Sequence, residues 1–229
     1  MTKILALDTS TDACSVALDI NGNVTQDFRI IPRQHTKQLL PMVQDMLREH
    51  DLTVADLDAI AVGRGPGSFA GIRIATGAAQ GLAFAAELPM LPTSTLAAMA
   101  LKIHRDTGAE YIVTALDARM DEIYCCAYQI QNGLPVELMP ETVCAPQQLQ
   151  LPDAADSWTV GGSGWVYLDV MSAEVQQAVK PLEEMIYPAA AEIVTLALED
   201  WNAGKAVAPE EALPVYLRDE VAWKKKDQQ

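Results

Sequence analysis

The sequence predicts an α/β protein built from two similar lobes, and three features of the 229-residue chain indicate this. A strand ending in Asp, a second strand, an Asn-Gly turn and a third strand occur twice, with Asp8 and Asp117 standing about 109 residues apart. Strand-like and helical periodicities then alternate along the first half. An apolar strand also leads directly into a glycine-rich loop and a long apolar helix. A repeated order of elements is typical of a duplicated fold.

The first copy of the repeat opens with three strands in a meander, at 3–7, 14–20 and 23–30. Asn21-Gly22 lies between the second and third strands and is a strong hairpin signal. The pattern then predicts, in order, a helix at 36–49, a strand at 59–62, a helix at 72–86, a strand at 89–92 and a helix at 94–104.

The second copy begins after the polar stretch 104–109. Its meander is predicted at 111–116, 122–130 and 134–139, with Asn132-Gly133 as the hairpin turn. A strand at 158–160 and a helix at 188–203 follow. We therefore expect a first lobe at 1–105 and a reduced second lobe at 106–229, with the tail returning to the first lobe.

Composition limits the classes of function. Sixteen basic against 31 acidic residues give a formal net charge of −15, which argues against a chain that holds nucleic acid by itself. Lys224-Lys225-Lys226 is interpreted as a solvated end in preference to a nucleic-acid patch. Four cysteines without C-x-x-C spacing favour reduced thiols. No leader or membrane-spanning run is visible, so we expect a cytoplasmic protein with no membrane contact.

The glycine-rich loop, 63–73, reads GRGPGSFAGIR. One interpretation is an anion-binding cradle made by loop amides and a helix N-terminus. The alternative, which we favour because the phosphate-binding lysine of G-x-x-x-x-G-K-[ST] is absent, is a tight turn that lets the helix pack close to its strand.

Two predicted helices carry more apolar surface than one sheet face needs. The apolar side chains of 36–49 span about 160°, against about 100° for a simple core-facing stripe. This helix packs either against both its own sheet and a partner, or in a deeply buried position within its own lobe. The helix at 72–86 is apolar on nearly every side. Its Gly77 and Gly81 each cost about 1 kcal/mol relative to Ala, a cost that close approach of another helix would offset.

The strand-end aspartates are the best candidates for chemistry. Asp8 and Asp117 would face a cleft between the lobes and organise a metal and phosphates there. Alternatively, Asp8 makes a local turn and Asp117 pairs with Arg119. No glycine follows either aspartate, so we interpret the cleft as a vestigial nucleotide site. Its residues would be Asp8, Thr9, Ser10, Asp117, Gly161 and Gly162.

Motifs for other chemistry are missing from the sequence. The three histidines show no H-x-x-x-H or H-E-x-x-H spacing, and there is no G-x-S-x-G nucleophile motif. We therefore expect no catalytic residue, no metal site and no peptidase activity.

Several segments resemble the TsaB family, also called YeaZ. They are ILALDTSTDACSVAL, HTKQLLPMVQDML, GRGPGSFAGIRIATGAAQGLA, LPTSTLAAMA, LDARMDEIY and PVYLRDEVAWK, and they span nearly the whole chain. The glycine segment and LDARMDEIY are the specific ones. The resemblance implies the fold of the actin-like ATPase superfamily, with two ribonuclease-H-like lobes.

The resemblance also implies a function. TsaB is a paralogue of TsaD, which transfers a threonylcarbamoyl group to the adenosine next to the anticodon in tRNAs that read codons starting with A. The chain is then expected to be a non-catalytic subunit that binds TsaD, with the ATPase TsaE as a further member, and to form a homodimer when alone. No cofactor is expected, apart from a nucleotide at the subunit interface.

In this family, pairing uses the first two helices of the N-terminal lobe. The residues expected to make that interface are Leu39, Val43, Met46, Ile72, Thr76, Ala79 and Ala83. On this expectation Ala79→Glu abolishes pairing and leaves the fold intact. The rival hypothesis is an enzyme that binds ATP in its own interlobe cleft.

Overall fold

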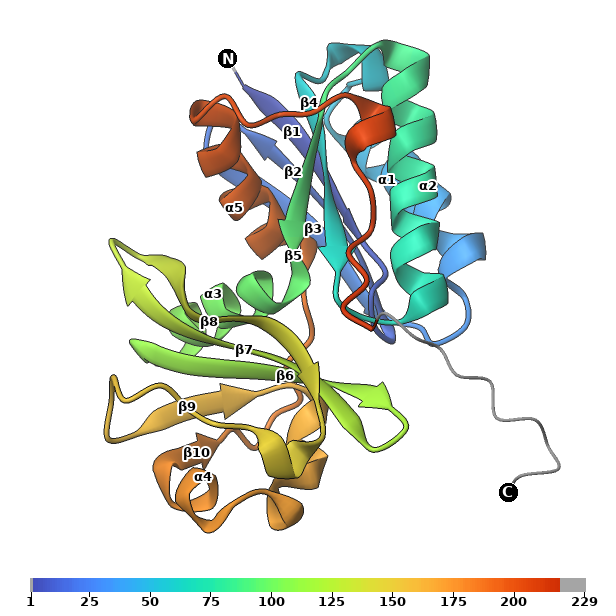
Figure 1. Ribbon diagram of the computed structural model, residues 1–229. Helices are drawn as coiled ribbons and strands as arrows, with labels where there is room; N and C mark the ends of the chain where they lie inside the picture. The colour runs from blue at the N-terminus through green and yellow to red at the C-terminus, as the bar shows by residue number, and fades with distance from the viewer. Residues whose placement is uncertain (1, 219–229) are drawn as a thin grey trace, which may run out of the picture.

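The computed structural model describes residues 2–218 and contains two five-stranded sheets, one in each lobe (Figure 1). Their strand orders are β3-β2-β1-β4-β5 and β10-β9-β6-β7-β8. The two orders describe the same topology, because β1 and β6 occupy equivalent positions. Each pairs antiparallel with the next strand in sequence and parallel with a later one, β4 or β9. The duplicated fold predicted from the repeat is therefore confirmed.

The first lobe follows the predicted order of elements. It contains β1 (Lys3–Asp8), β2 (Ala13–Ile20), β3 (Asn23–Ile30), α1 (His35–Glu49), η1 (Val54–Asp56), β4 (Ala59–Gly65), α2 (Phe69–Ala86), β5 (Met90–Ser94) and α3 (Thr95–Thr107). Helix α2 begins three residues before its predicted start, because the Ser68 hydroxyl accepts a hydrogen bond from the Gly71 amide and caps the helix.

The second lobe keeps the sheet and loses the long helices. Its elements are β6 (Tyr111–Arg119), β7 (Glu122–Gln131), β8 (Leu134–Cys144), η2 (Pro146–Gln148), β9 (Trp158–Gly161), η3 (Ser163–Val170), α4 (Ala173–Ala178) and β10 (Val179–Pro181). Short 3₁₀ segments and the six-residue α4 stand where the first lobe has α1 and α2. The predicted reduction of the second lobe is confirmed.

The first sheet is covered on both faces, and its side chains are divided by size between them. Leu5 and Leu7 of β1 pack against α1 and α2, together with Val16, Ile60 and Val62. The alternate residues Ile4 and Ala6 face α5 (Ala190–Asn202), together with Ala17, Ala59 and Ala61. Small alanines on this second face let α5 approach closely. Figure 1 shows α1 and α2 side by side on one face of the sheet, with α5 on the other.

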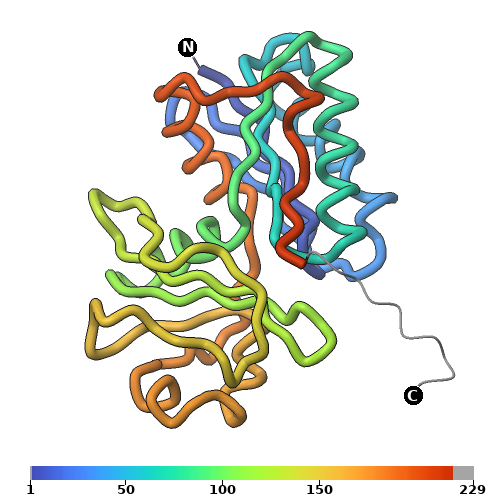
Figure 2. The backbone as a smooth tube through the Cα atoms, in the orientation of Figure 1, coloured from blue at the N-terminus to red at the C-terminus, as the bar shows by residue number. Residues whose placement is uncertain are grey.

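The chain returns to the first lobe after residue 189. The Ala190 amide donates to the Ser15 hydroxyl at 3.0 Å, and Met90 and Val207 exchange two backbone hydrogen bonds of 2.9 Å. Figure 2 traces residues 203–218 across the top of the first lobe and down beside α2. Residues 190–218 therefore lie with the first lobe, where α5 covers the alanine-rich face of the sheet, so the tail that was expected to return to this lobe begins at residue 190.

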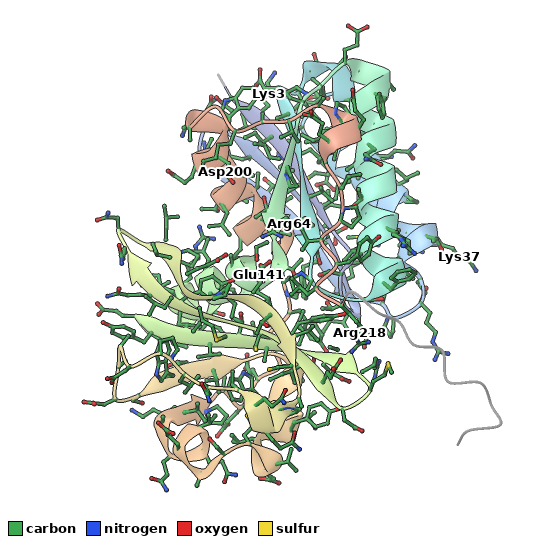
Figure 3. The ribbon with its side chains drawn as sticks, in the orientation of Figure 1. Lys3, Lys37, Arg64, Glu141, Asp200 and Arg218 are labelled. Atoms are coloured by element: carbon green, nitrogen blue, oxygen red, sulfur yellow. The ribbon has the colours of Figure 1, made fainter. Side chains whose placement is uncertain are left out.

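An ion pair near α3 joins the two lobes, with the Glu141 side chain 7% and the Arg64 side chain 25% exposed. Arg64 of β4 lies 3.1 Å from Glu141 of β8, and the Ser94 hydroxyl also donates to that carboxylate. Figure 3 shows the labelled Arg64 and Glu141 side chains at the junction. Burial raises the pKa of Glu141 above its usual value, although the Arg64 charge opposes the shift.

Within residues 2–218, no helix is both long and apolar enough to cross a membrane. Lys224-Lys225-Lys226, interpreted above as a solvated end, lie outside the described residues.

Candidate functional site

The glycine loop packs against the chain's own β1–β2 turn. The Ser68 amide donates to the Ser10 carbonyl at 2.7 Å, and the Thr9 hydroxyl donates to the Gly71 carbonyl at 2.6 Å. A Cβ at Gly67 would lie 2.5 Å from the Ser10 carbonyl oxygen, and one at Gly71 would overlap the Thr9 carbonyl oxygen. The glycines therefore serve close packing, as the tight-turn interpretation predicts, and the approach to the loop is filled by this turn.

Asp8 is fully buried at the end of β1. Its Oδ1 accepts hydrogen bonds from the amide and the hydroxyl of Ser10, at 3.1 and 2.9 Å. Its Oδ2 has no partner, and a side chain at Gly63 would overlap it. Burial raises the pKa of Asp8 to about 7, while the two Ser10 bonds lower it. The two hydrogen bonds from Ser10 match the alternative in which Asp8 makes a local turn. The contact between Oδ2 and Gly63 leaves no space there for a metal ion.

Asp117 ends the equivalent strand of the second lobe and is held by its neighbours. Its carboxylate accepts from the Arg119 amide at 2.8 Å and pairs with the Arg119 guanidinium at 3.1 Å. The Asp117 amide donates to the Ser163 hydroxyl at 3.0 Å, beside the second glycine loop. A Cβ at Gly162 would overlap the Ala115 carbonyl oxygen, and one at Gly161 would lie 2.9 Å from Ile103 Cδ1. These glycines also serve packing inside the lobe.

The six residues of the predicted nucleotide site thus form two separate local clusters. Asp8, Thr9 and Ser10 lie against the first glycine loop, and Asp117 lies beside the loop that contains Gly161 and Gly162. No hydrogen bond or ion pair found among residues 2–218 joins the two clusters. In the same part of the chain, no group of three His, Cys, Asp or Glu side chains is arranged to hold a metal.

The predicted docking residues face the wrong way for a surface. All seven are buried in the first lobe, and none is more than 4% exposed. Five of them, Leu39, Val43, Met46, Ala79 and Ala83, belong to the core that includes Leu5 and Leu7. The register of the interface was therefore wrong, because the sheet takes the large apolar side chains of α1 and the alanine side of α2, which carries Ala75, Ala79 and Ala83. The expectation for Ala79→Glu is also overturned, since Ala79 is fully buried.

The solvent faces of the same helices carry a different set of residues. On α2 the exposed residues are Phe69, Ala70, Arg73, Gly77, Gly81, Phe84 and Ala85, and on α1 they are Thr36, Lys37, Leu40, Pro41, Gln44, Arg48 and Glu49. We call these two stripes the helix-pair face. A Cβ at Gly77 or at Gly81 would meet no atom of residues 2–218 within 4 Å. Nothing inside the described molecule therefore requires glycine at these two positions.

The comparisons with known proteins agree on one family. The tRNA threonylcarbamoyladenosine biosynthesis protein TsaB of Escherichia coli is 43% identical over 226 residues, covering 97% of each chain. The protein of the same name from Haemophilus influenzae is 39% identical over 232 residues, covering 97% of this chain and 96% of its own. A family model described as TsaD, tRNA N6-adenosine threonylcarbamoyltransferase, matches residues 28–226. The chain belongs to the TsaB family, within the wider family of that model.

A solved TsaB-family structure has the same fold. The structure of YeaZ from Pseudomonas aeruginosa is 45% identical and covers 95% of this chain and 100% of its own, with a TM-score of 0.90. The resemblance drawn from the sequence is therefore confirmed, and with it the actin-like superfamily fold of two ribonuclease-H-like lobes.

Sequence reasoning expected the tail to return to the first lobe but missed the contacts that the C-terminal segment makes with β4 and α2. Leu213–Arg218 lies along α2, where the Val215 amide donates to the Arg64 carbonyl at 2.8 Å and the Tyr216 hydroxyl accepts from Arg73 Nε at 2.8 Å. No periodicity marks this irregular segment, so only its resemblance to other family members could have drawn attention to it. The outward stripe of α2 did have a signal, because Gly77 and Gly81 stand four residues apart.

Proposed function

We propose that the chain is a non-catalytic subunit in the synthesis of threonylcarbamoyladenosine next to the anticodon of tRNA. In this proposal it binds and activates a TsaD subunit through the helix-pair face, and TsaE joins the same assembly. The names of its full-length relatives support the process. Through the same face, the chain alone would pair with a second copy of itself.

The observation that carries the proposal is the open space around Gly77 and Gly81. Each glycine costs an exposed helix about 1 kcal/mol relative to Ala, and no atom of residues 2–218 lies where the missing side chains would be. A partner helix that packs against this stripe would benefit, since small residues let two helix backbones approach closely. The neighbouring Phe84 and Leu40, which are 56% and 46% exposed, supply apolar contact area for such a helix.

Two further observations support a subunit without its own catalysis. The strand-end Asp8 is buried against Gly63 with no space for a metal, and both glycine loops are filled by the chain itself. The net charge of −15 favours a tRNA held by another subunit.

Reconstitution tests the proposal. The purified chain is mixed with TsaD, TsaE, the enzyme that forms threonylcarbamoyl-adenylate, ATP, threonine, bicarbonate and tRNA, and each protein is then omitted in turn. We expect modification of the tRNA to stop without this chain, while the chain alone neither hydrolyses ATP nor binds tRNA. Modification that continues without it would overturn the proposal.

The docking surface needs its own variant. Gly81→Glu places a carboxylate in open space on α2, so the fold should remain intact while binding of TsaD is lost. Asn202→Glu is the matched control, because it adds the same charge at the exposed end of α5, on the opposite face of the sheet. Equal affinity of Gly81→Glu and Asn202→Glu for TsaD would exclude the helix-pair face as the docking surface.

The rival function is an ATP-binding enzyme that uses the interlobe cleft. Calorimetry of the isolated chain with ATP and Mg²⁺ distinguishes the two functions. Micromolar binding that disappears in Asp8→Ala would favour the rival, against the geometry of the buried Asp8 carboxyl.

A further inference from the structure

An aromatic cluster holds one arginine at the N-terminal end of α2. The Arg73 guanidinium carbon lies 3.4 Å from the centre of the Phe69 ring and 5.2 Å from that of Tyr216. The two rings are 5.8 Å apart, and the Tyr216 hydroxyl accepts a hydrogen bond of 2.8 Å from Arg73 Nε. Stacking on Phe69 and the bond to Tyr216 together fix the plane of the guanidinium.

Tyr216 is itself anchored on both sides along the chain. Before it, Gln80 of α2 donates to the carbonyls of Pro209 and Ala212, at 2.9 and 3.4 Å. After it, Arg218 donates to the Ala118 and Arg119 carbonyls of the second lobe, each at 3.2 Å. Figure 1 shows this segment descending beside α2 to the base of the first lobe. The cluster is therefore a fixed feature of the fold.

Arg73 has no carboxylate partner within residues 2–218, although 31 of the 229 residues are acidic. Its Nε is used by Tyr216, and the two terminal nitrogens make no hydrogen bond within the described residues. An oriented guanidinium binds a carboxylate with two parallel hydrogen bonds. Arg73 thus presents a preorganised carboxylate-binding group, on the same exposed stripe as Gly77 and Gly81.

We propose that Arg73 receives a carboxylate of the partner helix that packs over Gly77 and Gly81, with Phe69 and Tyr216 as positioning residues. The proposal rests on the function proposed above and adds the chemistry of the partner at this end of the interface. The partner meant here is the TsaD subunit of that proposed function. Helix α2 contains no acidic residue and Asp45 of α1 is paired with Arg48 at 2.6 Å, so a second copy would have to offer the exposed Glu49 or Glu87, and self-association is therefore one arm of the test.

The test is calorimetric titration of TsaD into the chain and its variants, at about 50 mM and about 300 mM salt. We expect Arg73→Ala to weaken binding at least about thirtyfold, as for other interfacial charge pairs. Arg73→Lys keeps the positive charge but cannot make two parallel hydrogen bonds to one carboxylate. It should therefore bind TsaD more tightly than Arg73→Ala and less tightly than the unmodified chain. Tyr216→Phe keeps the ring and removes the hydroxyl, so it should weaken binding by a smaller factor.

Arg29→Ala is the matched control, because Arg29 of β3 is an exposed arginine outside the helix-pair face whose carboxylate partner, Asp27, lies within this chain. Its affinity should stay within about twofold of the unmodified chain. Affinity of the unmodified chain should fall more steeply with salt than that of Arg73→Ala, a difference that a merely structural role of Arg73 would not produce.

Three outcomes would overturn the inference. If Arg73→Ala binds TsaD within about threefold of the unmodified chain while Gly81→Glu does not bind, the docking face stands and the role of Arg73 fails. If neither variant loses affinity, the docking proposal itself fails. If Arg73→Ala abolishes only self-association, the carboxylate belongs to a second copy and the stated partner is wrong.

Discussion

Replacing Asp8 with Asn tests directly whether the strand-end carboxyl is a buried neutral group. Asp8 is fully buried, its Oδ2 has no hydrogen-bond partner, and desolvation raises its pKa from 3.8 to about 7. Asn has nearly the same shape, and its Oδ1 can keep both hydrogen bonds from Ser10. The substitution therefore removes the ionisation and leaves the packing against Gly63 almost unchanged.

The size of the change in unfolding free energy follows from the pKa of the Asp8 carboxyl in the unfolded and in the folded chain. In the unfolded chain Asp8 ionises near pH ~3.9, whereas in the folded chain it keeps its proton until about pH 7. Between these values the folded state binds more protons, so the free energy of unfolding falls as the pH rises. Each pH unit of this interval is worth about 1.4 kcal/mol, which amounts to about 4 kcal/mol once the pH passes about 7.

Urea unfolding of both proteins at about pH 5 and about pH 8 measures the effect. Asp8→Asn should be the more stable protein at the higher pH, and the difference in unfolding free energy should widen by about 3 kcal/mol between the two conditions. Other titrating groups are common to both proteins and cancel in this difference. A gap that does not change with pH would refute the reasoning.

Asp117→Asn is the control for this experiment, because it changes the equivalent strand-end residue of the second lobe. Asp117 pairs with Arg119, whose side chain is 86% exposed. Losing such a surface pair should cost less than about 1 kcal/mol at either pH. A pH-dependent gain as large as that of Asp8→Asn would show that the effect does not come from burial.

Three further predictions follow from the same structure. Gly77→Ala and Gly81→Ala should each raise the free energy of unfolding of the isolated chain by about 1 kcal/mol and weaken TsaD binding; tighter binding would contradict the docking face. Ala79→Glu should destabilise the fold by about 3 kcal/mol or more in urea unfolding, since the charge enters the core; a normally stable variant would show that Ala79 is accessible. Arg64→Ala should cost about 3 kcal/mol in the same assay, and more than Glu141→Gln, because it leaves a buried carboxylate unpaired; equal losses would argue against a charge effect.

Much of the fold could be predicted because it depends on local patterns. Asn21-Gly22 and Asn132-Gly133 fix hairpins, and strand and helix periods fix the order of elements in the first lobe. The short segments of the second lobe were harder, because η3 and α4 carry no sustained period. The absence of glycine after Asp8 and after Asp117 argues against phosphate binding. The complete burial of the Asp8 carboxyl in the structure supports the same conclusion.

The candidate surface was predicted at the level of helices and missed at the level of residues. An apolar arc shows that a helix has a buried side, but both 39–46 and 72–83 offered apolar residues on more than one side. The sheet decided the matter, because Leu5, Leu7 and Ile60 pack against the alanine side of α2 and leave the side that carries Gly77 and Gly81 exposed. The irregular segment that brings Tyr216 to Arg73 gave no local signal at all.

The sequence by itself determined the duplicated α/β fold, the TsaB family and the two helices that carry the candidate surface, since each depends on order and spacing along the chain. Only the tertiary structure decided which sides of those helices meet solvent, that α5 covers the alanine-rich face of the first sheet, and that Arg73 is held in a fixed orientation by the Phe69 and Tyr216 rings. These features depend on competition among distant segments for the same sheet faces, and packing free energy, not local periodicity, settles that competition.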